Sequence, residues 1–496
     1  MIYKKEPNLE VGIVSGIELT FNFNKPFYLV NQESVTTNNK DPEGNINIPE
    51  GAIIINLDEP EGTVQILLDK PEVFDPSKLN ESKDTVQIFN NEYAVKFVDG
   101  FVIFQGEKFK RLEFKPLEIE GSCFELYNVS IGKDFHWERT EKQSFEGNLI
   151  IIVEETMLTA INQVPLESYL TSVISSEMSA KASEELLKAH AVISRSWLLS
   201  QLQQKGKNSV KNQGFTENEK EHIKWYDRED HQNFDVCADD HCQRYQGITK
   251  ASTQKVRKAI EATRGQVLCS DEEICDARFS KCCGGMMEEF QNCWEDSPKP
   301  YLLGIADKFG SEVKEKKVGN NEISDLRDEE NAIEFISGSP EAFCNTKDKR
   351  ILEQVLNNYD QETTDFFRWQ VKYSKEEISN LINKKSGMEF GTILELNPLQ
   401  RGISGRIIKL EIVGEKKTLI IGKELEIRKW LSPSHLYSSA FMVEKKSDEF
   451  VLNGAGWGHG VGLCQIGAAV MGENGFEYNE ILNHYYPNAE LVILYE

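Results

Sequence analysis

Apolar and polar residues alternate with two different periods along this chain, one typical of strands and one typical of helices. Up to about residue 150, short runs rich in Val, Ile and Phe are separated by turn residues such as Asn90-Asn91 and Asp99-Gly100. This pattern predicts strands over residues 11–17, 52–56, 63–68, 85–89, 93–104 and 149–153. Strands are expected to return at residues 407–412 and 418–425.

The segment 164–178 changes to a helical period. Its apolar stripe follows the spacing i, i+4, i+7 and i+11 and is formed by Leu166, Leu170, Val173 and Glu177. A core-facing carboxyl group is partly desolvated, which raises its pKa, and such an acid suits cleavage of a glycosidic bond. On spacing alone, a glutamate that ends its helix near solvent is an equally good interpretation of Glu177.

A second helix is predicted from about Ser183, which can cap it, with Glu184 and Glu185 at its positive end. Lys188 and Arg195 lie seven residues apart, which is two turns, so they share one face of this helix. Two cations that follow the acid could bind a glycan, although a lone pair of this kind is more often solvated. The expected buried residues are Leu186, Leu187, Ala191, Ile193 and Trp197.

Glycines alternate with other residues over 454–462, near the C-terminus. Alternating glycines permit close approach of the backbone to a ligand or to another segment. A nucleotide-binding loop is excluded, because no βαβ unit with a later ribose-binding acid accompanies the glycines. Cys464 beside His459 could form a nucleophile pair, but a small buried residue is the favoured interpretation of Cys464.

His231, Cys237 and Cys242 have the short spacing that zinc ligands often show. Three ligands leave a fourth tetrahedral position for water or for a distant side chain, and His241 is a spare candidate. A Cys237–Cys242 disulfide is the alternative in an oxidising compartment. The other cysteines of the ten in the chain allow too many pairings for an assignment.

Three sets of motifs resemble the SpoIID/LytB family, the sporulation stage II protein D group. They occur in the family's order between about residues 135 and 487. The motifs are Val164-Pro-Leu-Glu-Ser-Tyr-Leu with Ser-Glu-Met178 and Ser-Arg-Ser-Trp197, Ala262-Thr-Arg-Gly-Gln-Val-Leu268 with Gly284-Gly285, and Gly456-Trp-Gly-His-Gly-Val-Gly-Leu-Cys-Gln-Ile-Gly-Ala468 with Ile481-Leu-Asn-His-Tyr-Tyr-Pro487. The chain departs from the family at His190, where glutamine is common, and at Phe279–Cys283, which replaces a Tyr-His-Ser-x-Ser segment.

The resemblance implies a peptidoglycan lytic transglycosylase that cuts glycan strands between N-acetylmuramic acid and N-acetylglucosamine, with Glu177 as the single acid/base. The substrate-binding residues that it implies are Lys188, Arg195, His459 and Gln465. It also implies a structural zinc ion on His231, Cys237 and Cys242. The alternative is a non-catalytic, amidase-enhancer-like protein that binds peptidoglycan, because the LytB branch is associated with a partner amidase.

The predicted fold class is α+β, with a SpoIID-like catalytic core, a β-rich N-terminal region and helical or polar insertions. We expect the N-terminal region at residues 1–130 and the SpoIID-like domain at 131–496, with insertions at about 201–230 and 300–383. The expected partners are peptidoglycan glycan strands, and a cell-wall amidase is a further candidate.

The composition narrows the expected partners and location. A formal net charge of -25 argues against nucleic acid, which binds clustered positive charge. No stretch approaches the roughly 20 apolar residues of a membrane span. The substrate implies the cell envelope or periplasm, although the first residues show no apolar signal core.

Overall fold

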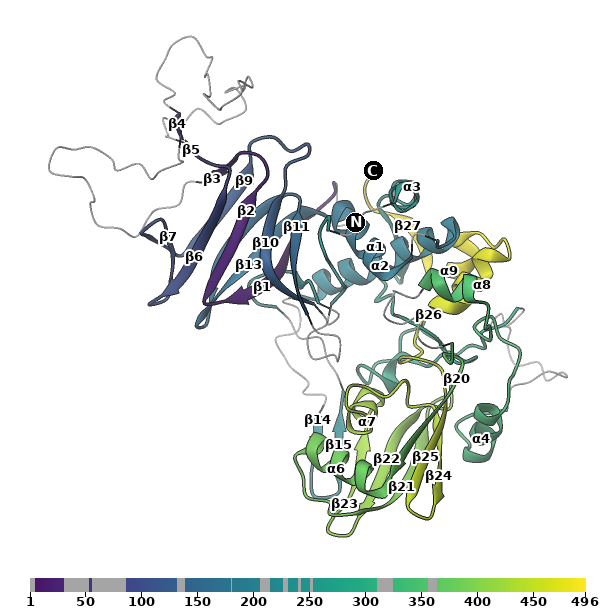
Figure 1. The fold of residues 1–496 in the computed structure, drawn as a ribbon. Coiled ribbons are helices and arrows are strands. Elements are labelled where there is room, and N and C mark those ends of the chain that lie inside the picture. Colours follow the sequence, from purple (N-terminus) through teal and green to yellow (C-terminus); the bar gives the residue numbers. More distant parts are fainter. Residues whose placement is uncertain are drawn as a thin grey trace. The chain divides into compact units, whose positions relative to one another are not determined.

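The computed structural model of the chain describes residues 5–30, 53–55, 86–131, 139–179, 181–205, 215–225, 231–239, 242–249, 253–309, 324–355 and 364–496. Helices and strands are both abundant in these residues, which confirms the α+β class (Figure 1). The chain forms two compact units. The first comprises Pro7–Val173 and His231–Ala251, and the second comprises Met1–Glu6, Ile174–Asp230 and Ser252–Glu496. The domain boundary expected at residue 130 divides the chain elsewhere and stays a prediction.

The first unit contains two sheets with strand orders β16-β1-β13-β12-β9-β3-β5-β4 and β11-β10-β2-β6-β7-β8. Aromatic rings connect them: Phe21 and Phe23 of β2 each lie 5.4 Å from the ring of Phe114 in β9. The period-2 pattern of β2 therefore buries one face of its sheet against the other sheet. The strands are β1 (Asn8–Gly16), β2 (Glu18–Phe23), β3 (Phe27–Leu29), β4 (Ile53–Ile55), β5 (Val86–Phe89), β6 (Glu92–Val98), β7 (Phe101–Phe104), β8 (Glu107–Phe109), β9 (Arg111–Pro116), β10 (Phe124–Ile131), β11 (Arg139–Phe145), β12 (Asn148–Glu154), β13 (Met157–Pro165) and β16 (Val236–Cys237).

Most strands predicted for this part of the chain are present. The runs at 11–17, 52–56, 85–89 and 149–153 correspond to β1, β4, β5 and β12. The predicted strand 93–104 is two strands, because Asp99 and Gly100 both have positive φ, at 50° and 78°, and form a tight turn. The predicted strand 63–68 lies outside the described residues.

A central helix, α2 (Glu184–Gln204), organises the helical part of the second unit. It begins where the sequence predicts, with the Ser183 hydroxyl accepting a hydrogen bond from the Leu186 N–H at 3.2 Å. Every residue from Ala189 to Gln201 is buried, because other elements of the unit cover the helix on all sides. Those elements are α3 (Gln254–Ala262), α8 (Gln465–Glu473), α9 (Tyr478–Tyr485), β17 (Gln266–Ser270) and β18 (Glu273–Ile274). β17 also pairs with β27 (Glu490–Ile493), and β19 (Phe279–Ser280) pairs with β26 (Leu463–Cys464).

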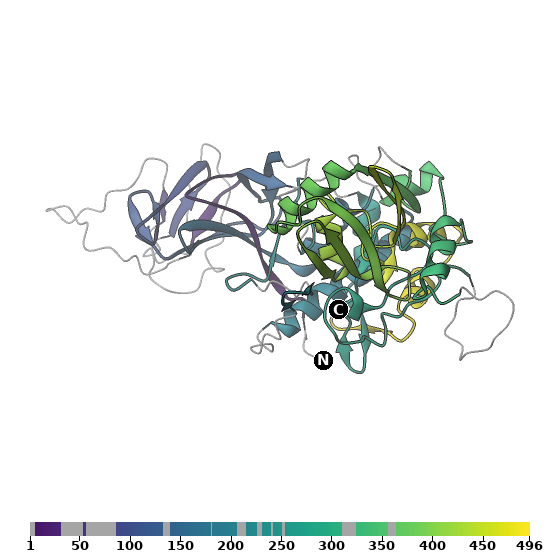
Figure 2. The same cartoon turned by 90° about the horizontal axis from the view of Figure 1, so that it is seen from below.

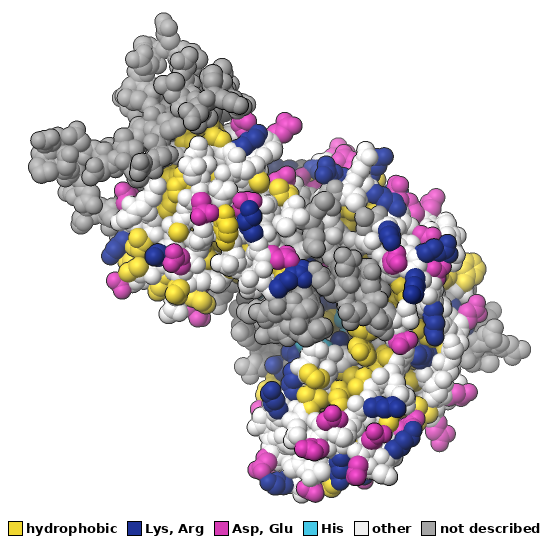
Figure 3. Space-filling view, viewed as in Figure 1, with side chains coloured by type: hydrophobic (Ala, Val, Ile, Leu, Met, Phe, Trp, Pro, Cys, Tyr) yellow, Lys and Arg dark blue, Asp and Glu magenta, His cyan; other side chains and the backbone are white. Residues whose placement is uncertain are grey.

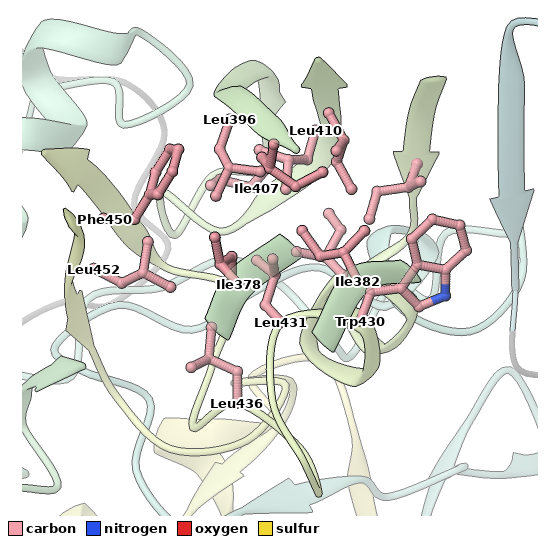
Figure 4. Close-up of a cluster of buried hydrophobic side chains, with 14 of the residues drawn as sticks. Ile378, Ile382, Leu396, Ile407, Leu410, Trp430, Leu431, Leu436, Phe450 and Leu452 are labelled. Carbon is pink, nitrogen blue, oxygen red and sulfur yellow. The ribbon is translucent and has the colours of Figure 1, made fainter. Parts of the chain in front are cut away.

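Two further sheets and their helices share an apolar core within the second unit. Ile378 and Ile382 of α6 point toward Ile407 and Leu410 of β22, and Trp430 of α7 closes the same cluster (Figure 4). Figure 2 shows these green elements from a second direction. The sheet orders are β14-β15-β23-β22-β21 and β20-β25-β24. The strands are β14 (Phe215–Glu217), β15 (Glu221–Lys224), β20 (Arg368–Ser374), β21 (Ile393–Arg401), β22 (Ile407–Gly414), β23 (Thr418–Gly422), β24 (Phe441–Lys446) and β25 (Glu449–Ala455), and the helices of the core are α6 (Lys375–Ser386) and α7 (Glu424–Trp430). Outside this core, α4 (Glu329–Ser337) packs against β24 and β25, and α5 (Lys349–Val355) packs against α8.

Three predicted segments differ from the structure. The polar segment 201–230 contributes β14 and β15, and β15 pairs in parallel with β23. The expected helical insertion 300–383 contains α4, α5 and most of α6, but it also contains the strand β20, which includes buried Trp369 and pairs with β25. The predicted strand 418–425 ends at Gly422, and α7 begins at Glu424. β15 and β20 pair with strands that lie far away in sequence, so local composition gave no signal of these pairings.

Charged side chains of both signs are interspersed over the face drawn in Figure 3. Several exposed pairs of this kind are hydrogen-bonded, including Arg327 with Asp325 at 2.7 Å. Such exposed pairs contribute little to stability. Across the described segments, no helix is both long and apolar enough to cross a bilayer.

The cluster in Figure 4 gives a test of the fold. Leu410 is fully buried in it, so Leu410→Ala should lower the free energy of unfolding by about 2–5 kcal/mol through lost burial and a new cavity. Leu399 on neighbouring β21 is 50% exposed, and Leu399→Ala should change that free energy by less than about 0.5 kcal/mol. Urea unfolding of both variants measures this difference, and equal losses would contradict the described packing.

Candidate functional site

Glu177 is the last residue of α1 (Leu166–Glu177), which begins in the first unit and whose residues from Ile174 belong to the second. The stripe before it is fully buried, since Leu166, Leu170 and Val173 each have no exposed area. Glu177 itself is partly exposed, at the point where the apolar stripe meets the surface. The negative end of the helix dipole disfavours an ionised carboxylate at this position. Glu177 therefore combines partial access to solvent with a position at the C-terminal end of a buried helical stripe.

The turn after Glu177 is held in place by α5. The Ser179 N–H donates to the carbonyl of Gln354 at 3.0 Å, and the Gln354 side-chain oxygen accepts from the Ser183 N–H at 2.9 Å. The Gln354 amide nitrogen also donates to Glu473 of α8 at 2.7 Å. One nearly buried glutamine therefore connects the end of α1, the start of α2 and α8.

Lys188 and Arg195 lie in different surroundings although they share a helix face. The Lys188 ammonium contacts Glu185 at 2.8 Å and Glu184 at 3.0 Å, and the hydrogen bond to Glu185 raises its pKa. Arg195 is fully buried and donates to the carbonyl of Gln266 in β17 at 2.9 Å. This placement favours a positioning role for Arg195, and the substrate contacts expected of both residues stay a prediction.

Gln465 and His190 connect the glycine motif to α2. Both are buried, and Gln465 Nε2 lies 3.0 Å from His190 Nε2. Because an amide nitrogen only donates, His190 Nε2 accepts, and the ring proton on Nδ1 is directed at the Ser194 hydroxyl, 3.2 Å away. Burial lowers the pKa of His190 to about 3, so the ring is neutral. The ring of Phe279 packs edge-on against His190, with centroids 4.6 Å apart.

His459 is held by the backbone on either side of its ring. Its Nδ1 accepts from the Val461 N–H at 3.0 Å, and its other backbone partner is the carbonyl of Phe279. Burial, and then the charges of Arg278, Arg428 and Arg406, lower its pKa well below the ordinary value. The neutral ring therefore carries its proton on Nε2. Phe279 thus touches both histidines, and the three family motifs meet at this residue.

Arg278 and Trp294 are neighbours of His459 that the sequence did not indicate as site residues. The Arg278 guanidinium lies 4.3 Å from the Trp294 ring centroid and pairs with Asp276 at 2.7 Å. The Trp294 and His459 rings lie 4.9 Å apart. Arg278 could have been noticed because it precedes Phe279 in the middle motif, whereas nothing in the sequence marks Trp294.

The glycines of the last motif pack closely against protein atoms. A Cβ added at Gly460 would lie 2.4 Å from the Arg406 guanidinium carbon, and one at Gly456 would lie 2.8 Å from the Cys282 carbonyl oxygen. Gly456, Gly458, Gly460 and Gly462 also have positive φ. The alternation of glycines is therefore explained by close approach to other segments of this unit.

A buried polar network fixes this glycine run. Arg406, fully buried, donates to the Gly458 carbonyl at 3.1 Å and to the Ser404 hydroxyl at 3.0 Å. Ser404 in turn donates to the Glu288 carboxylate at 2.6 Å, and the Glu288 N–H donates to the Gly460 carbonyl at 2.9 Å. Both charged groups are thus hydrogen-bonded within the interior, as buried charges require.

His231, Cys237 and Cys242 converge in the first unit. Their ligand atoms all lie within 4.8 Å of one another, with His231 Nε2 and the Cys242 sulfur 3.5 Å apart. The latter distance matches the edge of about 3.5 Å that zinc–nitrogen and zinc–sulfur bonds give in a tetrahedron. Phe234 stacks on His231 at 4.5 Å and orients the ring. The donor set and its spacing fit zinc; the spare candidate, His241, lies outside the described residues.

Comparison with known proteins defines the class. A family profile described as "Stage II sporulation protein" (SpoIID) matches residues 154–269, and a "Domain of unknown function (DUF8618)" matches residues 288–462. The SpoIID match contains Glu177 and α2, and the second match contains His459 and the Glu288–Ser404–Arg406 network.

Several relatives span much of the chain. An uncharacterized protein of Brachyspira hyodysenteriae is 24% identical over 349 residues, which is 70% of this chain and 72% of that protein. Stage II sporulation protein D of Bacillus subtilis is 21% identical over 343 residues, 69% of this chain and 78% of that protein. The amidase enhancer of Bacillus subtilis is 24% identical over 236 residues, 47% of this chain but 32% of that protein.

These matches define a protein with a cell-wall-related role. The profile match over residues 154–269 and these relatives support the resemblance to the SpoIID family that the motifs predict.

The neutral, buried His190 predicts a pH dependence of stability. Its pKa is about 3 in the folded chain, against about 6.5 when unfolded, so between these values the unfolded state binds the extra proton. Wild type should therefore lose stability as the pH falls from about 6.5, more steeply than His190→Gln by up to about 1.4 kcal/mol per pH unit. Urea unfolding at a series of pH values measures both slopes, and parallel curves would contradict the described burial.

Proposed function

We propose that the protein is a peptidoglycan lytic transglycosylase that acts outside the cytoplasm, with Glu177 as its single acid/base. The observation that carries this proposal is the position of Glu177, partly exposed at the end of a buried helical stripe inside the SpoIID-matched segment. The meeting of the three family motifs at Phe279 supports it, because a lone acid cannot orient a glycan without fixed partners.

In the proposed reaction, the Glu177 carboxylic acid donates its proton to the glycosidic oxygen between N-acetylmuramic acid and N-acetylglucosamine. The bond from the muramic C1 to that oxygen breaks, and N-acetylglucosamine leaves with a hydroxyl group. The Glu177 carboxylate then takes the proton of the muramic C6 hydroxyl as that oxygen bonds to C1, which closes a 1,6-anhydro ring. The carboxyl group ends protonated, so one residue serves as acid and then as base.

The surrounding residues divide into positioning groups and a candidate contact group. Arg195 anchors α2 to β17, while Gln465 and His459 fix the glycine motif through His190 and Phe279. We assign these three to positioning. Arg278 is partly exposed beside His459 and is the cation that we propose for the carboxylate of the muramic acid lactyl group, since guanidinium and carboxylate groups form strong hydrogen bonds.

We further propose a structural zinc ion on His231, Cys237 and Cys242. The ion would cross-link the side chains of His231, Cys237 and Cys242. Cys237 belongs to β16, which pairs with β1. Cleavage through Glu177 requires no Lewis acid, so the proposed ion has no part in the reaction.

The acid has a direct test. Glu177→Gln keeps the size and polarity of the side chain but cannot cycle a proton, so turnover should fall by a factor of about 100 or more. The control is Glu167→Gln, the same change ten residues earlier on α1. Digestion of purified glycan strands without stem peptides, whose lactyl carboxylates are free, measures turnover when the 1,6-anhydro products are counted by mass spectrometry.

Near-wild-type product from folded Glu177→Gln protein would remove Glu177 from the reaction. Absence of anhydro products from wild type, together with stimulation of a cell-wall amidase, would favour the amidase-enhancer-like alternative, a function named for one of the relatives.

The zinc proposal is tested by elemental analysis of protein purified under reducing conditions without added metal. Cys237→Ser should contain one zinc ion fewer per chain than wild type, because it removes one of three ligands. Cys123→Ser, which changes a cysteine outside this group, should keep the wild-type content. Equal zinc in Cys237→Ser and wild type, with a Cys237–Cys242 peptide two hydrogens light, would establish the disulfide instead.

A further inference from the structure

A second group of metal-ligating side chains lies in the interior of the second unit. Cys283, Asp307, Cys344 and Cys464 each place one sulfur or carboxylate oxygen within 4.8 Å of the other three. All four residues are buried, and Asp307 and Cys464 have no exposed area. None of them belongs to the proposed His231 zinc site or to the proposed reaction of Glu177.

The four side chains come from four separate segments. Cys283 follows β19, Asp307 lies in the segment before α4, Cys344 lies between α4 and α5, and Cys464 is the N-cap of α8. The Cys283 and Cys344 sulfurs are 3.6 Å apart. Zinc–sulfur bonds of about 2.3 Å give a tetrahedral sulfur–sulfur edge of about 3.8 Å, so this pair already has ligand spacing.

The Asp307 carboxylate is oriented by neighbouring donors. The Tyr485 hydroxyl donates to Oδ1 at 2.8 Å, and the Cys344 N–H donates to Oδ2 at 3.0 Å. Each oxygen has a second lone pair, and His484 Nε2 lies 3.6 Å from Oδ1. A carboxylate with no exposed area is unfavourable unless it is paired or binds a metal. Outer donors of this kind fix the direction of a metal-binding carboxylate.

Backbone N–H groups are directed at the sulfurs. The Cys283 N–H donates to the Cys464 sulfur at 3.2 Å, and the Gly285 N–H donates to the Cys283 sulfur at 3.4 Å. The second contact depends on a turn in which Gly284 and Gly285 have φ of 82° and 105°, values that favour glycine. The run Cys282-Cys283-Gly284-Gly285 therefore forms a turn that directs a backbone N–H at the Cys283 sulfur.

Positive charge lies beside the group. Arg368 interacts electrostatically with Cys344 and Cys283, and its guanidinium donates to the Gly284 carbonyl at 2.9 Å. Buried Arg406 donates to the Cys283 carbonyl at 3.2 Å. Three thiolates and one carboxylate around a divalent ion leave excess negative charge, and these two arginines offset it.

We propose that Cys283, Asp307, Cys344 and Cys464 bind a structural zinc ion. A disulfide between Cys283 and Cys344 would use two of the three sulfurs and would leave His484, whose Nε2 lies 3.6 Å from Asp307 Oδ1, as the neighbouring candidate cation for the carboxylate. The ion fixes the turn at Gly284, where an added Cβ would lie 2.8 Å from the Gly456 nitrogen. Zinc at this position therefore holds the glycine motif against the middle motif.

Zinc content of the full chain tests the proposal. Native mass spectrometry and elemental analysis of wild type, purified under reducing conditions, should find one zinc ion more than the His231 site accounts for. Cys344→Ser should lose one ion, Cys237→Ser the other, and the double variant both. Cys123→Ser should keep the wild-type content. Unchanged zinc in Cys344→Ser would overturn the proposal, whatever happens at the His231 site.

Two further measurements keep the proposal testable if Cys344→Ser does not fold. Wild-type protein purified without reductant should keep all three thiols; a Cys283–Cys344 peptide two hydrogens light would show a disulfide and overturn the site. Asp307→Asn should bind zinc at least tenfold more weakly, as measured by competition with a chelator. Cys282→Ser, at a thiol that adjoins Cys344 and Cys464, should bind as wild type does. Wild-type zinc affinity in Asp307→Asn together with weakened affinity in Cys282→Ser would overturn the ligand assignment.

Discussion

The burial of helix α2 on all sides is the constraint on which the second unit depends. The residues from Ala189 to Gln201 include polar side chains, and each must find a partner inside the protein, since an unsatisfied buried group costs about 1–3 kcal/mol. Arg195 meets this requirement at the Gln266 carbonyl of β17, and His190 meets it at Gln465 of α8. Ser196 accepts from the Leu268 N–H at 2.8 Å. The polar groups of α2 therefore determine where β17 and the glycine motif lie.

A second buried hydrogen-bond network also holds the glycine motif in place. Glu288, Ser404 and Arg406 hold Gly458 and Gly460, and all three residues lie in the segment that matches the domain of unknown function. The helical core and this segment thus meet at one glycine run. The matched segment includes the glycine run itself, so its charged interior residues and the family motif belong to one hydrogen-bonded structure.

Local periodicity was enough to predict α1, the Ser183 cap of α2 and most strands of the first unit. It could not predict β15 and β20, which pair with β23 and β25, strands that are distant in sequence. The spacing of Lys188 and Arg195 correctly predicted that they share a helix face. Spacing does not show which neighbouring elements cover that face, and of the two residues only Arg195 is buried. His190 is hydrogen-bonded to Gln465, which lies 275 residues away, and sequence spacing does not show this contact. The same holds for the group of Cys283, Asp307, Cys344 and Cys464, which only the tertiary structure brings together.

We propose that a glycan strand is cut at Glu177. A crystal structure of Glu177→Gln with a bound N-acetylglucosamine–N-acetylmuramic acid oligosaccharide tests it most directly. We expect the glycosidic oxygen to lie within hydrogen-bonding distance of the residue 177 amide and the muramic carboxylate to lie near Arg278. A strand bound with its glycosidic oxygens beyond the reach of residue 177 would contradict the account.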